Sequence, residues 1–162
     1  MEIVANVSHR YIMHGFGWGW HRSHHEPSRG RWEKNDLYAI VFACVAIALF
    51  AIDALGFGAL FWIAVGITAY GAAYALLHDV LVHQRIRARR IPHWRYLQRL
   101  IEAHRIHHAT KTRDGAVSFG FLYTDQPRHL ARALRELRAT RTTHASGAPS
   151  APRAARPNKS TT

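Results

Sequence analysis

The sequence predicts an all-α, integral-membrane helical bundle in which a transmembrane hairpin supports a cytoplasmic, histidine-rich site for two metal ions. Three observations favour this fold class. The long stretch from Leu37 to Leu77 contains one formally charged residue, Asp53. Histidines gather in four short clusters before and after that stretch, and basic residues flank it on both sides. At 162 residues, the chain has room for one such domain and a short tail.

The four clusters use two spacings, each of them twice. An HX4H pair and then an HX2HH triplet precede the apolar stretch, and the same order returns after it. The ten residues are His9, His14, His21, His24, His25, His78, His83, His104, His107 and His108. Chance would not repeat this arrangement in so short a chain. Because neutral imidazole is a common ligand of iron, zinc and copper, we predict a polynuclear metal centre.

The N-terminal segment has no features of a cleavable signal peptide. Glu2 follows Met1 directly, and neither a basic region nor a long apolar core comes before His9. The single cysteine, Cys44, rules out an intrachain disulfide. Since it lies within the apolar stretch, we expect a reduced, buried thiol that packs as a small apolar residue.

The apolar stretch predicts a helical hairpin. It is too long for one membrane span and about right for two, since a bilayer core needs roughly 20 apolar residues per helix. We expect one helix near 36–53 and a second from about 59 into the HDVLVH segment, with the turn at Asp53, Gly56 and Gly58. The first helix is short for a span, so it would tilt or thin the bilayer locally. A soluble, buried hairpin is the alternative.

The flanking charges favour the membrane and give an orientation. The turn between the two helices contains no Lys or Arg. Basic residues on the two outer flanks are Arg10, Arg22, Arg29, Arg31 and Lys34 before the hairpin, and Arg85, Arg87, Arg89, Arg90, Arg95 and Arg99 after it. By the positive-inside rule, both ends of the hairpin face the cytoplasm. The hairpin therefore returns the later histidines to the same membrane face as the earlier ones.

The last triplet lies on the apolar face of a predicted helix. At about 100° per residue, His104, His107 and His108 fall on the same stripe as Leu97, Leu100 and Ile101. The opposite arc carries Arg95, Gln98, Arg99, Glu102 and Arg105. Three buried imidazoles need partners or a metal, because unpaired buried polar groups are costly.

The two spacings suggest different geometry. HX2HH places imidazoles at i, i+3 and i+4, from where they can converge on one ion. Residues five apart are about 140° apart on an α-helix. An HX4H pair therefore holds one ion poorly unless the helix bulges, and otherwise suits two ions. Ten nitrogens fit two metals with four to six ligands each. Spacing does not separate the candidate metals, although a closed zinc site would need four ligands and not ten.

Other polar residues have weaker cases. His93 is expected at the membrane interface or as an outer ligand, and His129 and His144 as solvated side chains. Candidate acceptors for imidazole N–H groups are Glu2, Asp36, Asp79 and Glu102. Asp79, which lies inside the third cluster, is the strongest of these, whereas Glu102 falls on a polar arc and is expected in solvent.

The composition changes after Tyr123. We expect a membrane domain over residues 1–125 and a basic tail over 126–162. The segment PRHLARALRELRATR (127–141) predicts a short basic helix. From Thr142 to Thr162, Ala, Ser, Thr, Pro and Arg dominate, and this composition lacks the apolar content needed for a folded core.

These motifs resemble a known family. HRYIMHGFGWGWHRSHHEP, WEKNDLYA, HDVLVHQR and AHRIHHA followed by VSFGFLY are similar, in this order, to the bacterial β-carotene 3-hydroxylases of the membrane fatty acid hydroxylase and sterol desaturase superfamily. The resemblance covers about residues 2–123. It implies that the ten clustered histidines hold two iron ions, and that the protein uses O2 to hydroxylate carotenoid β-ionone rings at C3, giving β-cryptoxanthin and then zeaxanthin. It also implies a ferredoxin-type electron donor, whose acidity would suit a basic cytoplasmic face.

One feature departs from the family pattern. Family members usually have a longer apolar segment before the first histidine motif, whereas eight residues precede His9 here. We therefore expect that the first membrane helix is truncated, either because Met1 is internal to a longer protein or because this is a shortened form.

Several other functions stay open at this level. Related di-iron enzymes act on fatty acyl chains or sterols, and a carotenoid ketolase shares the substrate class. A non-catalytic, metal-binding membrane protein would use the same histidines without consuming O2. The formal charge of +12 also suits nucleic acid or an acidic protein partner. We do not expect a nucleic-acid binder, because that function leaves the membrane hairpin and the buried histidines unexplained.

Overall fold

The computed structural model describes residues 1–26, 32–56, 58–85 and 93–146, and within these ranges every regular element is a helix. In chain order the elements are α1 (Glu2–Val7), the π-helix η1 (Ser8–Phe16), α2 (Trp18–His25), α3 (Asp36–Asp53), α4 (Ala59–Tyr74), the π-helix η2 (Ala75–Val82), α5 (Arg95–His108) and α6 (Pro127–Ser146). The predictions for Arg29, Arg31, Arg87, Arg89, Arg90, the side chain of His144 and residues 147–162 lie outside the described residues.

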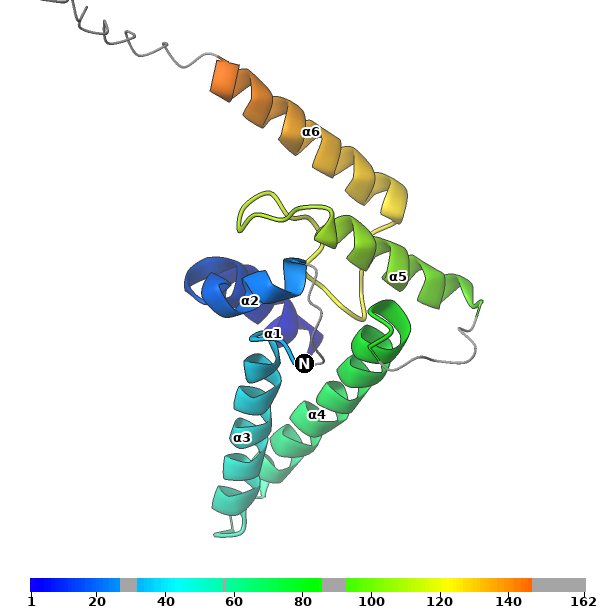
Figure 1. Cartoon of the computed structure of the whole chain (residues 1–162). Coiled ribbons are helices and arrows are strands. Elements are labelled where there is room, and N and C mark those ends of the chain that lie inside the picture. The colour runs from blue at the N-terminus through cyan, green and yellow to red at the C-terminus, as the bar shows by residue number, and fades with distance from the viewer. Residues whose placement is uncertain (27–31, 57, 86–92, 147–162) are drawn as a thin grey trace, which may run out of the picture.

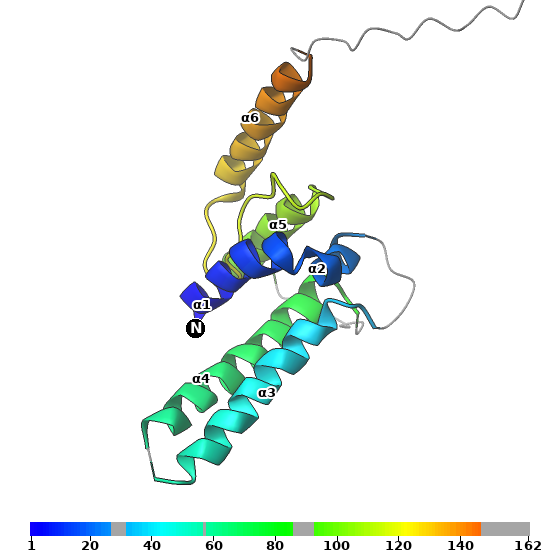
Figure 2. The same ribbon diagram turned by 90° about the vertical axis from the view of Figure 1, so that its left-hand side faces the viewer.

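Helices α3 and α4 form the predicted hairpin. They pack against each other, and Figures 1 and 2 show them running side by side to a turn at their far end. Gly56 and Gly58 lie in this turn with φ values of 103° and 66°, a left-handed conformation that glycine adopts without a steric penalty. The predicted bounds of both helices are confirmed, and the second continues as η2.

The hairpin has the surface of a membrane element. In the described part of the chain, the helices long and apolar enough to cross a membrane are Asp36–Asp53, with 18 residues, and Ala59–Val82, with 24. Most of their large apolar side chains face outward; Ile47 is 66% exposed and Trp62 is 71% exposed. A continuous apolar surface of this kind would be unfavourable in water, so it argues against the soluble alternative. An 18-residue helix is about 27 Å long, slightly less than a bilayer core of ~30 Å.

The prediction of a buried Cys44 is wrong. Its thiol is free and exposed on α3. The reason is that α3 packs mainly against α4, so much of its circumference has no protein neighbour. An apolar run predicts removal from water, and in a hairpin of this kind lipid provides that environment.

The remaining helices cover the end of the hairpin at which α3 begins and η2 ends. Figures 1 and 2 show α2 and α5 across this end, with α6 beyond α5. Leu130 and Leu134 of α6 pack with Ala103 of α5 and with Val117. The basic helix predicted over 127–141 is present and extends to Ser146.

Glu2 joins three parts of the fold. Its carboxylate accepts hydrogen bonds from the backbone N–H groups of Phe121, Leu122 and Tyr123 at 2.6, 3.0 and 3.1 Å, and from the Tyr70 hydroxyl at 2.7 Å. Burial raises the pKa of this carboxyl, but the hydrogen bonds outweigh burial and the pKa is lowered. Glu2 thus ties α1 to α4 and to the segment after α5. Its described contacts include no histidine, although the sequence suggested it as an acceptor for one.

Candidate metal centre

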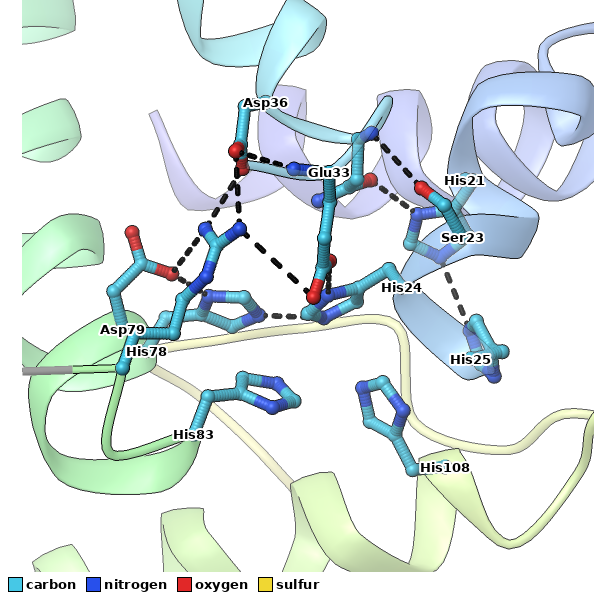
Figure 3. Close-up of polar contacts among 12 residues, drawn as sticks. His21, Ser23, His24, His25, Glu33, Asp36, His78, Asp79, His83 and His108 are labelled. Atoms are coloured by element: carbon cyan, nitrogen blue, oxygen red, sulfur yellow. Dashed lines mark hydrogen bonds and ion pairs between the residues drawn. The ribbon is translucent and has the colours of Figure 1, made fainter. Parts of the chain in front are cut away.

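Four helical segments bring the ten predicted histidines together at the covered end of the hairpin. The segments are η1, α2, the end of η2 and the end of α5. Part of the arrangement is drawn in Figure 3, where imidazoles from α2, η2 and α5 point toward a common centre. His78 and His107 are almost completely buried, at 1% and 0% exposure. Imidazole rings are therefore the main polar groups in this part of the interior.

Both HX4H pairs lie on π-helical backbone. A π-helix closes hydrogen bonds between residues five apart, and such bonds join His83 N to His78 O and Gly17 N to Ile12 O, both at 2.8 Å. Residues five apart are then one turn apart, so the two imidazoles of a pair lie on the same face. The 140° separation of an ideal α-helix does not apply here. This is the helix bulge, one of the geometries that the spacing left open.

Five imidazoles form one group, which we call cluster I. Their ligand-type nitrogens all lie within 4.8 Å of one another. Its members are His9, His14, His21, His25 and His107. Three helical segments contribute to it: η1, α2 and α5. The sequence separation between the first and last member shows that cluster I forms only when both ends of the domain fold together.

Each imidazole of cluster I donates its Nδ1–H to an uncharged oxygen. Four acceptors are backbone carbonyls and one is a side-chain amide. The pairs are His9 with Phe119 O at 3.0 Å, His14 with Arg113 O at 2.8 Å, His21 with Asn35 Oδ1 at 2.7 Å, His25 with Thr110 O at 2.8 Å and His107 with Val117 O at 3.1 Å. A neutral imidazole has one N–H, so these bonds leave every Nε2 as an acceptor.

The Nε2 atoms of cluster I therefore face one another without a proton between them. The distances are 3.1 Å for His9 and His21, and 3.2 Å both for His14 and His107 and for His25 and His21. Burial lowers the pKa of His9 to about 3 and that of His25 to about 4, with nearby imidazoles contributing to both shifts. The rings thus stay neutral at pH 7. Facing lone pairs repel unless a cation lies among them, so this donor set fits a metal ion.

A second group of closely spaced imidazoles forms cluster II. It consists of His24, His83, His104 and His108, whose ligand-type nitrogens also lie within 4.8 Å of one another. His104 Nε2 is 3.0 Å from His83 Nε2 and 2.9 Å from His108 Nε2. Burial lowers the pKa of His83 to about 3 and that of His108 to about 2, again with neighbouring imidazoles adding to the shift.

The HX2HH triplets do not converge on one ion each, which corrects the expectation from spacing. His21 and His25 join cluster I, whereas His24 between them joins cluster II. The second triplet divides in the opposite sense, with His107 in cluster I and both His104 and His108 in cluster II. The i and i+4 residues share one side of the helix, and the i+3 residue turns toward the neighbouring group. Each triplet therefore bridges the two clusters.

His78 adjoins cluster II through His24. Their Nε2 atoms are 2.9 Å apart, and the Tyr74 hydroxyl lies 3.0 Å from His78 Nε2. The other nitrogen, Nδ1, donates to Asp79 Oδ1 at 2.7 Å. Asp79 thus has the kind of contact that the sequence suggested for it.

Sequence reasoning missed a carboxylate network above cluster II. Glu33 Oε2 accepts from His24 Nδ1 at 3.1 Å. Arg85 binds both oxygens of Asp36, at 2.7 and 3.0 Å, and its guanidinium lies 3.8 Å from Glu33 and 3.7 Å from Asp79. Burial raises the pKa of the Glu33 carboxyl, and the Arg85 guanidinium opposes that shift. Asp36 pairs with Arg85 and with the Glu33 amide, and in the described contacts not with a histidine.

A signal for two of the missed residues was present in the sequence. Glu33 and Asn35 lie in WEKNDLYA, immediately before the first apolar helix, where polar residues usually indicate a helix start. The carbonyl acceptors of the segment 110–119 left no comparable signal, because any residue supplies a backbone carbonyl. Ser118, with φ of 64°, separates two of these carbonyls, those of Val117 and Phe119. A left-handed serine between two acceptors is a strained arrangement maintained by the surrounding fold.

Three other titratable residues considered from the sequence lie at the surface. His93, His129 and Glu102 are exposed, so the expectations of a solvated His129 and Glu102 are confirmed, and His93 is not an inner member of either cluster.

An apolar cavity of about 650 Å³ reaches the histidines from the hairpin. Side chains of α3 and α4 form its walls, among them Phe42, Ala46 and Ile67. His9 and Asp79 line its inner end. A cavity with this shape can bring an apolar molecule from the hairpin to cluster I.

The opposite side of the centre is basic. A smaller hollow of about 200 Å³ lies between α6 and the segment after α5, and Lys111, Arg138 and Arg141 line it. Thr110 also lines this hollow, and its carbonyl accepts from His25. One residue therefore separates the basic surface from an imidazole of cluster I.

Comparison with known proteins places these features in a family. The family model described as fatty acid hydroxylase matches residues 1–126. A β-carotene hydroxylase of Pantoea ananas is 54% identical over 136 residues, which cover 84% of this chain and 78% of that protein. A β-carotene hydroxylase of Paracoccus sp. (strain PC1) is 52% identical, with 83% and 84% covered. No solved structure matches the chain.

The similarity extends to plant enzymes in part. A chloroplastic β-carotene 3-hydroxylase of Arabidopsis thaliana is 40% identical over 115 residues, which cover 68% of this chain and 38% of that protein.

Proposed function

The chain belongs to the fatty acid hydroxylase family, and from this premise we propose that it hydroxylates carotenoid β-ionone rings at C3. The substrate would be β-carotene, converted to β-cryptoxanthin and then to zeaxanthin. Relatives named β-carotene hydroxylase, at 51–55% identity over most of the chain, support this assignment. The observation that carries it is the cavity, which is lined by α3 and α4 and reaches His9.

We propose that clusters I and II, with His78, hold two iron ions. When bound, such a pair supplies the activation of O2. Ten buried or half-buried imidazoles, whose ligand-type nitrogens lie close together, are the residues that would hold it. The overall reaction consumes O2, two electrons and two protons, and gives the alcohol and water.

The protein's own contribution is to position the ring. A polyene offers more reactive positions than the saturated C3 methylene, so the ring must be held close to the centre, at about 3–3.5 Å between reacting atoms. The apolar walls at Phe42, Ala46 and Ile67 suit a hydrocarbon ring and exclude water. Tyr70, which donates a hydrogen bond to Glu2, also lines this cavity.

The electrons have to come from a donor outside the chain. We propose an acidic, ferredoxin-type protein that docks on the basic surface made by α6 and Lys111. Arg128, Arg132 and Arg135 are exposed on α6, and Arg138 and Arg141 line the hollow behind Thr110. A donor bound there would lie close to His25, and opposite charges would speed its association.

We also propose that the protein lies in the bacterial inner membrane with the metal centre on the cytoplasmic side. The support is the basic character of the covered end and the lack of Lys or Arg in the turn 54–58. In this orientation the carotenoid enters from the bilayer and the donor from the cytoplasm.

The test is expression of the chain in cells that accumulate β-carotene, with pigments analysed by chromatography and mass spectrometry. We expect β-cryptoxanthin to form first and zeaxanthin to follow, because both ends of β-carotene are the same ring. The matched control is the His104→Ala variant in the same cells, which should leave β-carotene unchanged.

Three results would contradict the proposal. Ketone products would indicate a ketolase, and hydroxylated fatty acids beside unchanged β-carotene would indicate another lipid substrate. One tightly bound zinc in detergent-purified protein, in place of about two irons per chain, would contradict the di-iron centre.

A further inference from the structure

The two histidine clusters differ in the charge of the groups that hold their imidazoles. In cluster I, all five Nδ1–H groups donate to neutral oxygens, four of them backbone carbonyls and the fifth the Asn35 amide. In cluster II, His24 donates its Nδ1–H to the Glu33 carboxylate. His78, which adjoins cluster II, donates its Nδ1–H to the Asp79 carboxylate. His24 and His78 are also neighbours, with their Nε2 atoms 2.9 Å apart. The negative charge thus lies on one side of the centre.

The positive charge of Arg85 offsets the repulsion among three acidic side chains, Glu33, Asp36 and Asp79, beside cluster II. Its guanidinium binds Asp36 with two hydrogen bonds and lies within 4 Å of both Glu33 and Asp79. Among the described contacts one cation faces three carboxylates, so these four side chains together carry a net negative charge. Nothing similar is seen behind cluster I, where the described acceptors are uncharged.

We propose that the two metal positions are inequivalent, and that Glu33 and Asp79, arranged around Arg85, make the position at cluster II the tighter and more electron-rich one. This inference rests on the proposed di-iron function and deepens it. Glu33 and Asp79 are positioning residues, because they act through His24 and His78.

The physical reason is the pull of a carboxylate on an imidazole proton. A carboxylate that accepts from Nδ1–H makes the ring a stronger donor at Nε2, and it fixes the ring's orientation. A backbone carbonyl fixes the ring without adding charge. A metal ion at cluster II would therefore be bound more tightly and held in its higher oxidation state more easily than an ion at cluster I.

The experiment compares two isosteric exchanges of opposite sign in the full-length, detergent-purified protein. Glu33→Gln removes the charge behind His24 and keeps an oxygen acceptor. Asn35→Asp adds a charge behind His21 in cluster I, so it is the reciprocal variant. Metal-free protein is titrated with Fe²⁺ without oxygen, and the iron-loaded forms are compared by Mössbauer spectroscopy.

We expect the parent to bind two Fe²⁺ in two steps of unequal affinity and to show two quadrupole doublets. Glu33→Gln should weaken the tighter step by about 10–100-fold and leave the other step unchanged. Asn35→Asp should strengthen the weaker step and shift the other doublet. Asp79→Asn should resemble Glu33→Gln, which gives a second variant if one of them does not fold.

Equal affinities in the parent, or an equal shift of both steps in Glu33→Gln, would overturn the inference. The outcome is separate from that of the pigment assay. A protein that binds two Fe²⁺ unequally but leaves β-carotene untouched would contradict the proposed function alone. A protein that makes zeaxanthin with two equivalent irons would contradict this inference alone.

Discussion

Single imidazoles in this centre have two separate tasks. Nδ1 donates to an oxygen and fixes the ring, and Nε2 faces the neighbouring rings. His25 shows both, since Nδ1 donates to Thr110 O at 2.8 Å and Nε2 lies 3.2 Å from His21 Nε2. Removal of a ring leaves a carbonyl without its donor and a gap in the ligand set.

Alanine substitutions should separate clustered from solvated histidines. His24→Ala and His104→Ala each remove an imidazole from cluster II, and we expect the iron content to fall by about half or more and pigment conversion to be lost. His129→Ala, on the exposed face of α6, should leave both close to the parent. Metal analysis of purified protein and the pigment assay check this. Near-normal turnover of His24→Ala would show that this ring does not hold metal.

Ser118 tests the carbonyl acceptors. Its left-handed backbone separates the carbonyls of Val117 and Phe119, which accept from His107 and His9. Ser118→Val should cost roughly 1–2 kcal/mol of folding free energy, because a β-branched residue is disfavoured at positive φ. Ser118→Gly should keep the free energy of unfolding within about 1 kcal/mol of the parent. Thermal unfolding and iron content provide the comparison. Equal stability of the two variants would show that this conformation is not under strain.

At the residue scale, the sequence predicted the side chains and not their partners. All ten clustered histidines could be identified because their spacing repeats. Glu33 and Asn35 were hidden among ordinary helix-start residues. The carbonyls of Thr110, Val117 and Phe119 could not be predicted, because only the path of the backbone decides where a carbonyl points.

Among the elements, the two π-helices matter most for the site. An α-helical HX4H pair would diverge, whereas the π-helical turn brings both rings to one side. This explains why the spacing alone left two geometries open. The sequence shows how many residues separate two histidines, but contacts with other helices decide whether the backbone between them is α-helical or π-helical.

The junction between η1 and α2 gives an element-scale prediction. A Cβ on Gly17 would overlap the Tyr38 hydroxyl and would lie 2.9 Å from Ile12 O, the acceptor of the last π-helical bond. Gly17→Ala should therefore shift α2 with its three histidines, lower the free energy of unfolding by about 1–3 kcal/mol and reduce bound iron.

The matched control is Gly19→Ala, two residues further along. A Cβ there meets nothing within 4 Å, and alanine is favoured in a helix by up to about 1 kcal/mol over glycine. We expect unchanged or higher stability and normal iron content. If Gly17→Ala behaved like Gly19→Ala, the contact with Tyr38 would not fix the position of α2.

Helix boundaries were predicted well where one physical signal dominated. The apolar run and its glycine turn gave both hairpin helices. The end of α6 was predicted five residues too early, because the change in composition from Thr142 onward was interpreted as the start of the tail. In the structure the Thr142 hydroxyl donates back to the helix carbonyl of Arg138 at 3.0 Å, so this threonine continues the helix.

For the molecule as a whole, function depends on the order of its layers. The hairpin forms one end of the molecule, α2 and α5 lie across its other end, and α6 lies beyond α5 (Figure 1). The histidines lie at this covered end of the hairpin. The cavity opens between the hairpin helices, and the basic hollow lies on the side of α6. An apolar substrate and a charged partner can therefore approach the same centre from opposite sides. Charge and hydropathy along the chain predicted these two environments, and the cavity walls combine side chains of α1, η1, α3 and α4 that are distant in sequence.

The cavity gives a prediction for the whole molecule. Ala46 lines it on α3 and is 5% exposed, so a phenyl ring at this position would occupy the path to the histidines. Ala48 is exposed on the same helix and does not line the cavity, which makes it the matched position. We expect Ala46→Phe to lose most conversion of β-carotene while it keeps the parent's iron content and helix content, because the metal-binding rings lie beyond the obstruction. Ala48→Phe should convert β-carotene at close to the parent rate, since a larger apolar side chain facing lipid is tolerated.

Pigment analysis of both strains, with iron measured on the purified proteins, separates a blocked path from a damaged centre. Full activity of Ala46→Phe would mean that the ring reaches the histidines by another route, and loss of iron in that variant would mean that the cavity wall supports the centre itself.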